Sequence, residues 1–232
     1  MGKRIIVQAR GRGGPRYRVR SKAFTIRPRY PRKMAGEGTV VRIQDSAAHT
    51  APLAKIQYSE GFFYMPAFKG MVEGQKISLE NGEAKPGSIL RLKDVPIKTM
   101  IYNIEASPGD GGVFVRTGGS AGTVDRVSEK SVFIIMPSKQ EKEFNPMCRA
   151  TVGTAAGSGR LEKPIIKAGK RYYIKKSKGK LWPRTSAVKM NAVDHPFGSG
   201  RSKNPKSKIP KRNAPPGKKV GLLRPRRTGK VK

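Results

Sequence analysis

The chain has 232 residues, 36% of them hydrophobic, and 50 lysines and arginines against 15 acidic residues give a formal net charge of +35 at pH 7. This length and apolar content allow small folded domains but not one large core. The charge far exceeds the magnitude of about 2 to 8 that is usual for a small soluble domain, so the sequence indicates a polyanionic partner. The single cysteine, Cys148, excludes an internal disulfide and a cysteine-rich zinc site, and we expect it to be a small buried residue on a strand.

No apolar run approaches the ~18 residues that a bilayer span needs. The start of the chain, MGKRIIVQARGRG, also lacks the apolar segment of a signal peptide. We therefore expect a cytoplasmic protein without a membrane partner. No cofactor and no metal site are predicted.

The chain begins with a strongly basic arm. Residues 1–36 carry 12 lysines and arginines and no acidic residue. Arginine is mixed there with glycine and proline, periodicity does not extend beyond a few residues, and like charges repel one another. The pattern predicts an irregular N-terminal extension that is disordered when free and takes its order from a partner.

The centre of the chain is nearly neutral and has the pattern of short strands. Residues 37–162 carry 15 basic and 14 acidic side chains. In residues 37–97, β-branched and aromatic residues gather in the runs GTVVRIQD, PLAKIQYS, GFFYMP, QKISLE and SILRLKDV, with turn residues between them. Such runs predict a small β-barrel. The alternation of Val41 with Ile43, and of Ile56 with Tyr58, favours a strand with one buried face.

A second β series occupies residues 98–162, and we place the break between the two at about residues 95–99. Its runs are MIYNIEA, VFVR, GTVDRVS, SVFIIMPS, KEFN and CRATVG. The loop SPGDGG contains Gly109, Gly111 and Gly112, which allow positive φ and a close approach to RNA or to a neighbouring strand. Two small barrels of about equal size are expected, so the fold class is all-β.

The C-terminal residues 163–232 carry 23 lysines and arginines against the single Asp194. No β pattern is visible there, and so long a stretch without secondary structure is unusual inside a compact domain. We therefore expect an irregular basic extension that is ordered by something outside the chain.

Basic residues interleaved with aromatic ones indicate nucleic acid as the partner. They occur as RYR (residues 16–18), RPRYPRK (27–33), KRYYIKK (170–176) and KLWPR (180–184). Lysine and arginine neutralise phosphates, and aromatic rings stack on unpaired bases. A solvated cationic tail is the alternative. RNA is favoured over DNA because no amphipathic helix with a basic end is visible for the major groove, and the glycine clusters match no nucleotide-binding motif.

The segment NAVDHPFGSG, residues 191–200, contains Asp194 next to His195. A histidine oriented by a carboxylate can act as a general base, but no serine or cysteine nucleophile accompanies this pair. Pro196 favours an extended His195, and glycines follow. A stiff bend whose histidine contacts RNA is one interpretation, and a catalytic histidine is the other. His49, near a turn, is expected to face the surface or RNA.

Several distinctive segments follow one another along the whole chain: GKRIIVQARGRG, NIEASPGDGG, CRATVG, GRLEKPIIKAGKRYY, WP, MNAVDHPFG and RNAPPGKKVG. In this order they resemble the large-subunit ribosomal protein L2 family in its archaeal form. The set is specific, although each piece alone would be weak. The sequence departs from the family at His49, where arginine is usual, and at PSKQEKEF, where the family usually has PSGE.

The resemblance implies an oligonucleotide-binding-type barrel (residues 37–97) followed by an SH3-like barrel (98–162), between basic extensions 1–36 and 163–232. It implies a non-enzymatic structural constituent of the large ribosomal subunit that binds 23S rRNA near the peptidyl transferase centre and supports subunit association and tRNA binding. Neighbouring large-subunit proteins, and small-subunit rRNA at the interface, are the other implied partners. A role of His195 in peptide bond formation and non-specific DNA binding are the alternatives. The residues expected to contact rRNA are Lys3, Arg4, Arg10, Arg12, Arg16, Arg116, Arg149, Arg160, Lys167, Lys170, Arg171, Tyr172, Lys175, Trp182, Arg184, Asn191, His195, Arg201, Arg212, Asn213, Lys218, Lys219, Arg226 and Arg227.

Overall fold

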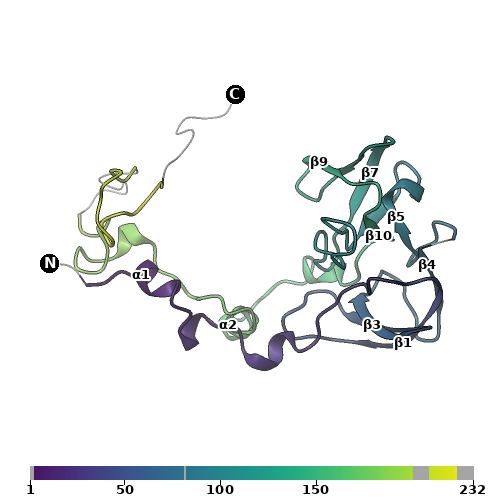
Figure 1. The fold of residues 1–232 in the computed structure, drawn as a ribbon. Coiled ribbons are helices and arrows are strands. Elements are labelled where there is room, and N and C mark those ends of the chain that lie inside the picture. Colours follow the sequence, from purple (N-terminus) through teal and green to yellow (C-terminus); the bar gives the residue numbers. More distant parts are fainter. Residues whose placement is uncertain (1–2, 81, 201–208, 224–232) are drawn as a thin grey trace. The chain divides into compact units, whose positions relative to one another are not determined.

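The computed structural model describes residues 3–80, 82–200 and 209–223. The chain divides into two compact units (Figure 1). One is continuous, Ser21–Ile166, and contains the described strands; we call it the β unit. The other, the chain-end unit, combines Met1–Arg20 with Lys167–Lys232. Among the residues described, none of the helices has the length and apolar character that a bilayer span requires.

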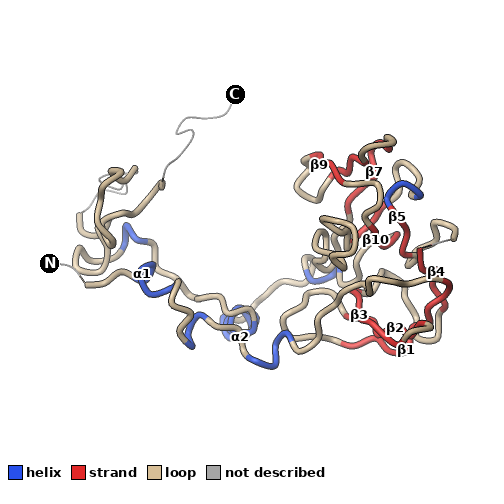
Figure 2. Tube along the Cα trace, in the orientation of Figure 1, coloured by secondary structure: helices blue, strands red, loops and turns tan. Residues whose placement is uncertain are grey.

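The strands of the β unit, red in Figure 2, pair into one sheet in the spatial order β3-β2-β1-β4-β5-β10-β6-β7-β8-β9. Neighbouring strands are antiparallel except β4 and β5, which are parallel. The strands are Gly36–Gln44 (β1), Leu53–Tyr58 (β2), Gly61–Pro66 (β3), Lys76–Glu80 (β4), Ile89–Arg91 (β5), Met100–Tyr102 (β6), Gly122–Val127 (β7), Val132–Ile135 (β8), Glu141–Phe144 (β9) and Arg149–Val152 (β10).

Two hydrophobic cores lie in the β unit, and strands in the middle of the sheet contribute to both. Ile89 and Tyr102 belong to the first core, whereas their sequence neighbours Leu90 and Ile101 belong to the second, and all four are at most 1% exposed. Successive side chains of a strand point to opposite faces of the sheet. Strands β5 and β6 therefore form a wall between the cores. The predicted all-β fold with two small barrels is confirmed, but the sheet runs without interruption past the expected break.

Two of the predicted strand runs differ from the structure. VFVR, residues 113–116, forms no regular strand, and within it Phe114 makes an isolated bridge to Ile104. The run SILRLKDV stops being a strand at Arg91, because Leu92–Asp94 turns into a 3-10 helix. Cys148 is fully buried, as predicted, but it lies directly before β10 and not on it.

A β-bulge changes the buried face that the alternation in β1 predicted. The pairing of β1 with β2 shifts register between Val40 and Arg42. One extra residue in a strand reverses which side chains face the core. Val40 is therefore buried, and Val41 is 46% exposed.

Part of the predicted N-terminal arm packs into the β unit. Tyr30 and Met34 are 3% and 5% exposed and belong to the first core. The Tyr30 hydroxyl donates to the backbone oxygen of Asn103 at 3.0 Å and also contacts the Thr151 hydroxyl. Burial raises the pKa of Tyr30. The aromatic ring of the RPRYPRK motif is therefore unavailable for stacking on a base.

The expectation of no secondary structure beyond residue 163 is wrong for one segment. Helix α2, Ala168–Ser177, has the sequence AGKRYYIKKS, in which alanine, lysine and arginine have high helix propensity and no proline intervenes. The other helices are short. They are Ile6–Arg10 (α1) and the 3-10 helices Pro15–Tyr17, Ser21–Phe24, Leu92–Asp94, Ser158–Arg160 and Ala187–Lys189.

Candidate nucleic-acid interface

The chain-end unit is held together by contacts between its N-terminal and C-terminal segments. The backbone N–H of Lys3 donates to the carbonyl oxygen of Val193 at 2.7 Å. Gly179 has a φ of +60°, and a Cβ built on it would lie 3.0 Å from Val19 Cγ2, so residues 19 and 179 approach closely. Figure 1 shows the purple N-terminal segment running beside the light green C-terminal one. The two arms therefore form one surface.

The charge of the chain-end unit is almost entirely positive. Its sequence contains 29 lysines and arginines and one acidic residue, Asp194. The Asp194 carboxylate lies 3.8 Å from Lys3 Nζ, and the two side chains are 45% and 75% exposed, so this pair adds little stability. One carboxylate cannot balance so many cations. The unit therefore presents the positive field that attracts a polyanion.

Most of the residues predicted to contact RNA come together in this unit, where they are exposed or half-buried. They are Lys3, Arg4, Arg10, Arg12, Arg16, Lys167, Lys170, Arg171, Tyr172, Lys175, Trp182, Arg184, Asn191, His195, Arg212, Asn213, Lys218 and Lys219. Three others, Arg116, Arg149 and Arg160, lie in the β unit. Arg201, Arg226 and Arg227 lie outside the described residues. For all of these residues, contact with RNA stays a prediction.

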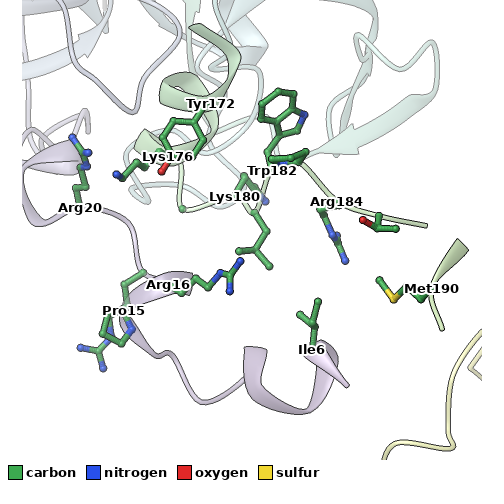
Figure 3. A pocket seen from close by; sticks show the side chains of 15 residues that line it. Ile6, Pro15, Arg16, Arg20, Tyr172, Lys176, Lys180, Trp182, Arg184 and Met190 are labelled. Atoms are coloured by element: carbon green, nitrogen blue, oxygen red, sulfur yellow. The ribbon is translucent and has the colours of Figure 1, made fainter. Parts of the chain in front are cut away.

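Aromatic side chains remain accessible beside these cations. Tyr172 on α2 is 41% exposed, and its ring centroid lies 5.4 Å from that of Tyr173. The Nζ of Lys176 is 5.3 Å from the centroid of the Tyr172 ring, a cation–π distance. Trp182 is half-buried, and Figure 3 shows it on the same side of a cavity as Tyr172. Cations and stacking surfaces are therefore combined, as unpaired nucleic acid requires.

Arg116 and the glycine loop serve the β unit itself. The guanidinium of Arg116 donates to the carbonyl oxygens of Gly112 and Pro28 at 3.0 and 2.9 Å, and burial lowers its pKa. A Cβ on Gly111 would lie 2.0 Å from Cγ of Arg29. The close approach that Gly111 allows is therefore to the side chain of Arg29, which lies in a segment outside the regular strands. Arg160 similarly donates from Nε to the Gly118 oxygen at 2.9 Å.

Arg149 is part of a buried ion pair that sequence reasoning missed. Its side chain is 4% exposed and donates from Nη2 and Nε to Oε1 of Glu105, at 2.8 and 3.1 Å, while Glu105 is fully buried. Glu105 also accepts from the backbone N–H of Gly111 at 3.0 Å, and Glu80 lies 3.3 Å from Arg149 Nη1. The pair fastens the SPGDGG loop to β10. Burial does not favour a contact between Arg149 and phosphate, and that contact stays a prediction.

The geometry around His195 differs from that of a catalytic dyad. Nδ1 of His195 accepts from the backbone N–H of Phe197 at 3.1 Å, and the Asp194 carboxylate pairs with Lys3. Burial lowers the pKa of His195, so the ring is neutral near pH 7. These contacts are those of a bend in which His195 is oriented by the backbone that follows it.

His49 is less open than predicted. Its Nδ1 lies 2.8 Å from the Ser46 hydroxyl, and its ring meets the Phe24 ring edge-on with centroids 5.2 Å apart. Burial, with a smaller effect from the positive charge of Arg116, lowers the pKa of His49. The side chain is half-buried within the β unit and acts there as a packing residue.

Comparison with known proteins identifies the family. Residues 85–217 match the model of the C-terminal domain of ribosomal proteins L2. The chain is 42% identical over 238 residues to large ribosomal subunit protein uL2 of Methanococcoides burtonii, covering 99% of this chain and 100% of that one. It is 44% identical to the protein of the same name from Archaeoglobus fulgidus, with 99% of each chain covered. The corresponding protein of Methanococcus aeolicus is 43% identical, with 99% of this chain and 100% of that one covered. The chain therefore belongs to the uL2 family of large ribosomal subunit proteins, in its archaeal form.

Proposed function

We propose that this protein is a structural component of the large ribosomal subunit, in the cytoplasm, and that it binds 23S rRNA through its chain-end unit. The β unit sets the orientation of the protein, and the basic arms reach between packed RNA helices and screen the repulsion of their phosphates. Neighbouring large-subunit proteins and, at the subunit interface, small-subunit rRNA are the further partners. Roles near the peptidyl transferase centre, in subunit association and in tRNA binding belong to the same proposal.

The observation that carries the proposal is the segregation of charge into one compact unit. The chain-end unit contains 29 of the 50 basic residues and one of the 15 acidic residues. Such a concentration of like charge opposes its own compact state, and phosphates remove that penalty by neutralising it. The family name of the relatives supports the choice of large-subunit rRNA as the polyanion.

Neither alternative function has an observation of comparable weight. A catalytic His195 needs a carboxylate that orients it, whereas Asp194 pairs with Lys3 and the backbone orients the ring. Helix α2, which was not predicted from the sequence, is basic. It could in principle favour the DNA alternative, because many DNA-binding proteins place a helix in the major groove. However, α2 has only 10 residues and none of them is buried, whereas a recognition helix in the major groove is packed on a supporting helix.

The salt dependence of binding to a structured fragment of large-subunit rRNA tests the proposal. The logarithm of affinity falls with the logarithm of salt concentration by about 0.7 to 0.9 for each neutralised phosphate. Replacing Arg10, Lys170 and Arg171 with glutamine should therefore reduce the slope by about 2 to 3. A filter-binding series over a range of salt concentrations measures this change.

The matched control removes the same charge from the β unit, at the exposed residues Lys69, Lys93 and Lys130. This variant should keep the slope of the unmodified protein. Equal losses from both variants would contradict an interface on the chain-end unit, and affinity independent of salt would contradict phosphate binding. Tighter binding to duplex DNA than to the rRNA fragment at equal salt would favour the DNA alternative.

A further inference from the structure

A cavity in the chain-end unit has features that a general phosphate-binding surface does not need. It has a volume of about 430 Å³, which lies in the range of about 300 to 1,000 Å³ that ligand sites occupy. Figure 3 shows Tyr172 and Trp182 along one wall and Ile6, Pro15 and Arg16 along the facing wall. Both arms of the chain therefore contribute to it.

The charges that line this cavity are all positive. They come from Arg16, Arg18, Arg20, Lys176, Lys180 and Arg184. None of these six side chains forms an ion pair with a carboxylate in the described part of the chain. Their charges are therefore available to an anion. Arginine is especially suited to phosphate, because its planar guanidinium can donate two parallel hydrogen bonds.

The aromatic residues of the cavity narrow the class of anion. The Tyr172 side chain is 41% exposed, and Trp182 lines the same cavity. A carboxylate-rich peptide would need only the cations. A nucleotide needs both features, because its base stacks on an aromatic ring while its phosphate is neutralised.

We propose that this cavity receives an unpaired nucleotide of RNA, with its base stacked on Trp182 and Tyr172 and its phosphates bound by Arg16 and Arg184. The inference rests on the proposed function and goes beyond it, because a helical RNA surface would satisfy the salt dependence without entering the cavity. It assigns the two aromatic residues a role in selecting a base that has left its helix.

A second cavity adjoins the first and can receive the next nucleotide of the RNA. It has a volume of about 530 Å³ and shares Ile6, Arg184 and Met190 with the first. Its lining also includes Asn191 and His195, which offer hydrogen-bonding groups, three further cations (Lys3, Arg4 and Lys189) and the carboxylate of Asp194. The nucleotide adjacent to the bound one can continue into this second cavity, with Arg184 between the two.

Trp182 gives a direct experiment, because it is the only tryptophan of the chain. The intrinsic fluorescence of the full-length protein is titrated with a short unpaired oligoribonucleotide, with the same strand in a duplex, and with polyglutamate. Stacking of a base on the indole should quench the emission with the unpaired strand and leave it nearly unchanged with the other two. This measurement needs no substitution, so a folding defect cannot produce the result.

Substitutions then test the two rings by the affinity for a labelled unpaired strand. Trp182→Leu and Tyr172→Leu should each weaken binding by about tenfold, the effect of losing one stacked base. Phe62→Leu is the matched control, because Phe62 is an aromatic residue that is 59% exposed, lies in the β unit and does not line the cavity. It should bind within about twofold of the unmodified protein.

The outcomes separate this inference from the proposed function. If structured rRNA binds with the expected salt slope but the unpaired strand neither quenches Trp182 nor distinguishes Tyr172→Leu from Phe62→Leu, the cavity assignment is wrong and the proposed function stands. Equal quenching by polyglutamate would make the cavity a site for acidic peptide and would also overturn the assignment. If no RNA binds, both proposals fail.

Discussion

At the residue scale, the buried ion pair of Glu105 and Arg149 shows that a basic residue of the β unit can stabilise the fold. We expect Glu105→Gln to lower the free energy of unfolding by about 3 to 5 kcal/mol, since removing one partner leaves a buried charge without adequate compensation. The remaining carboxylate, Glu80, lies 3.3 Å from Arg149 Nη1 and offsets part of the loss. Urea-induced unfolding followed by circular dichroism measures the change.

Glu83→Gln is the matched control for that substitution. Glu83 pairs with Lys85 at 2.7 Å, but both side chains are more than 75% exposed, so water replaces the lost contact. This variant should unfold at the same urea concentration as the unmodified protein. A Glu105→Gln variant as stable as this control would show that the buried pair does not fasten the SPGDGG loop.

At the scale of single elements, helix α2 is only weakly stabilised by its own sequence. It has 10 residues, none of them buried, and its N-cap residue Lys167 forms no side-chain capping bond. Isolated helices of this length are marginal in water. Gly169 lies in the helix with open space around its Cβ position. We expect Gly169→Ala to stabilise α2 by about 0.5 to 1 kcal/mol and to tighten RNA binding, because less ordering remains to be done on association.

Gly179→Ala adds the same methyl group just beyond the helix and should have the opposite effect. Gly179 has a φ of +60°, and its Cβ would meet Val19 at 3.0 Å, so alanine strains the backbone and separates the two arms. Far-UV circular dichroism without RNA and affinity for the rRNA fragment compare the two variants. Changes of the same sign in both would contradict this account of how α2 and the arm contact contribute.

Secondary-structure elements could be predicted where residues adjacent in the sequence determine them. Runs such as PLAKIQYS and GFFYMP became β2 and β3 because β-branched and aromatic residues fit a half-buried strand. Helix α2 was not predicted, because the high positive charge of the segment between Pro164 and Trp182 suggested an irregular arm. Lysine, arginine and alanine in that segment nevertheless favour a helix. The bulge after Val40 was not predicted, because nothing in the sequence marks the residue at which the pairing register of β1 with β2 shifts.

At the scale of the whole molecule, the sequence indicated two barrels and two basic arms but not how either pair is joined. The two cores share strands because β10 pairs with both β5 and β6, and such pairing between distant segments leaves no local pattern. The arms meet through Lys3 with Val193 and through Val19 with Gly179, contacts that composition cannot reveal. For the same reason the cavity beside Trp182 could not be predicted, although its cations and rings could.

The shared wall should make the two barrels unfold together. If the first core melted alone, Ile89 and Tyr102 would lose their neighbours while Leu90 and Ile101 stayed packed on the other face. Exposing two such side chains costs about 1.5 to 3 kcal/mol each, a large part of the 5 to 15 kcal/mol that stabilises a typical domain. A half-melted β unit should therefore be scarcely populated.

Core substitutions on the two sides of the wall test this coupling. Leu79→Ala in the first core and Ile134→Ala in the second should each destabilise the β unit by about 2 to 5 kcal/mol. Both residues are fully buried. Amide hydrogen exchange in urea should show the backbone N–H groups of β2 and β7 losing protection together, at a midpoint that moves equally for both strands in either variant. Independent barrels would instead let Leu79→Ala release β2 while β7 stayed protected, because no common wall would then transmit the loss from one core to the other.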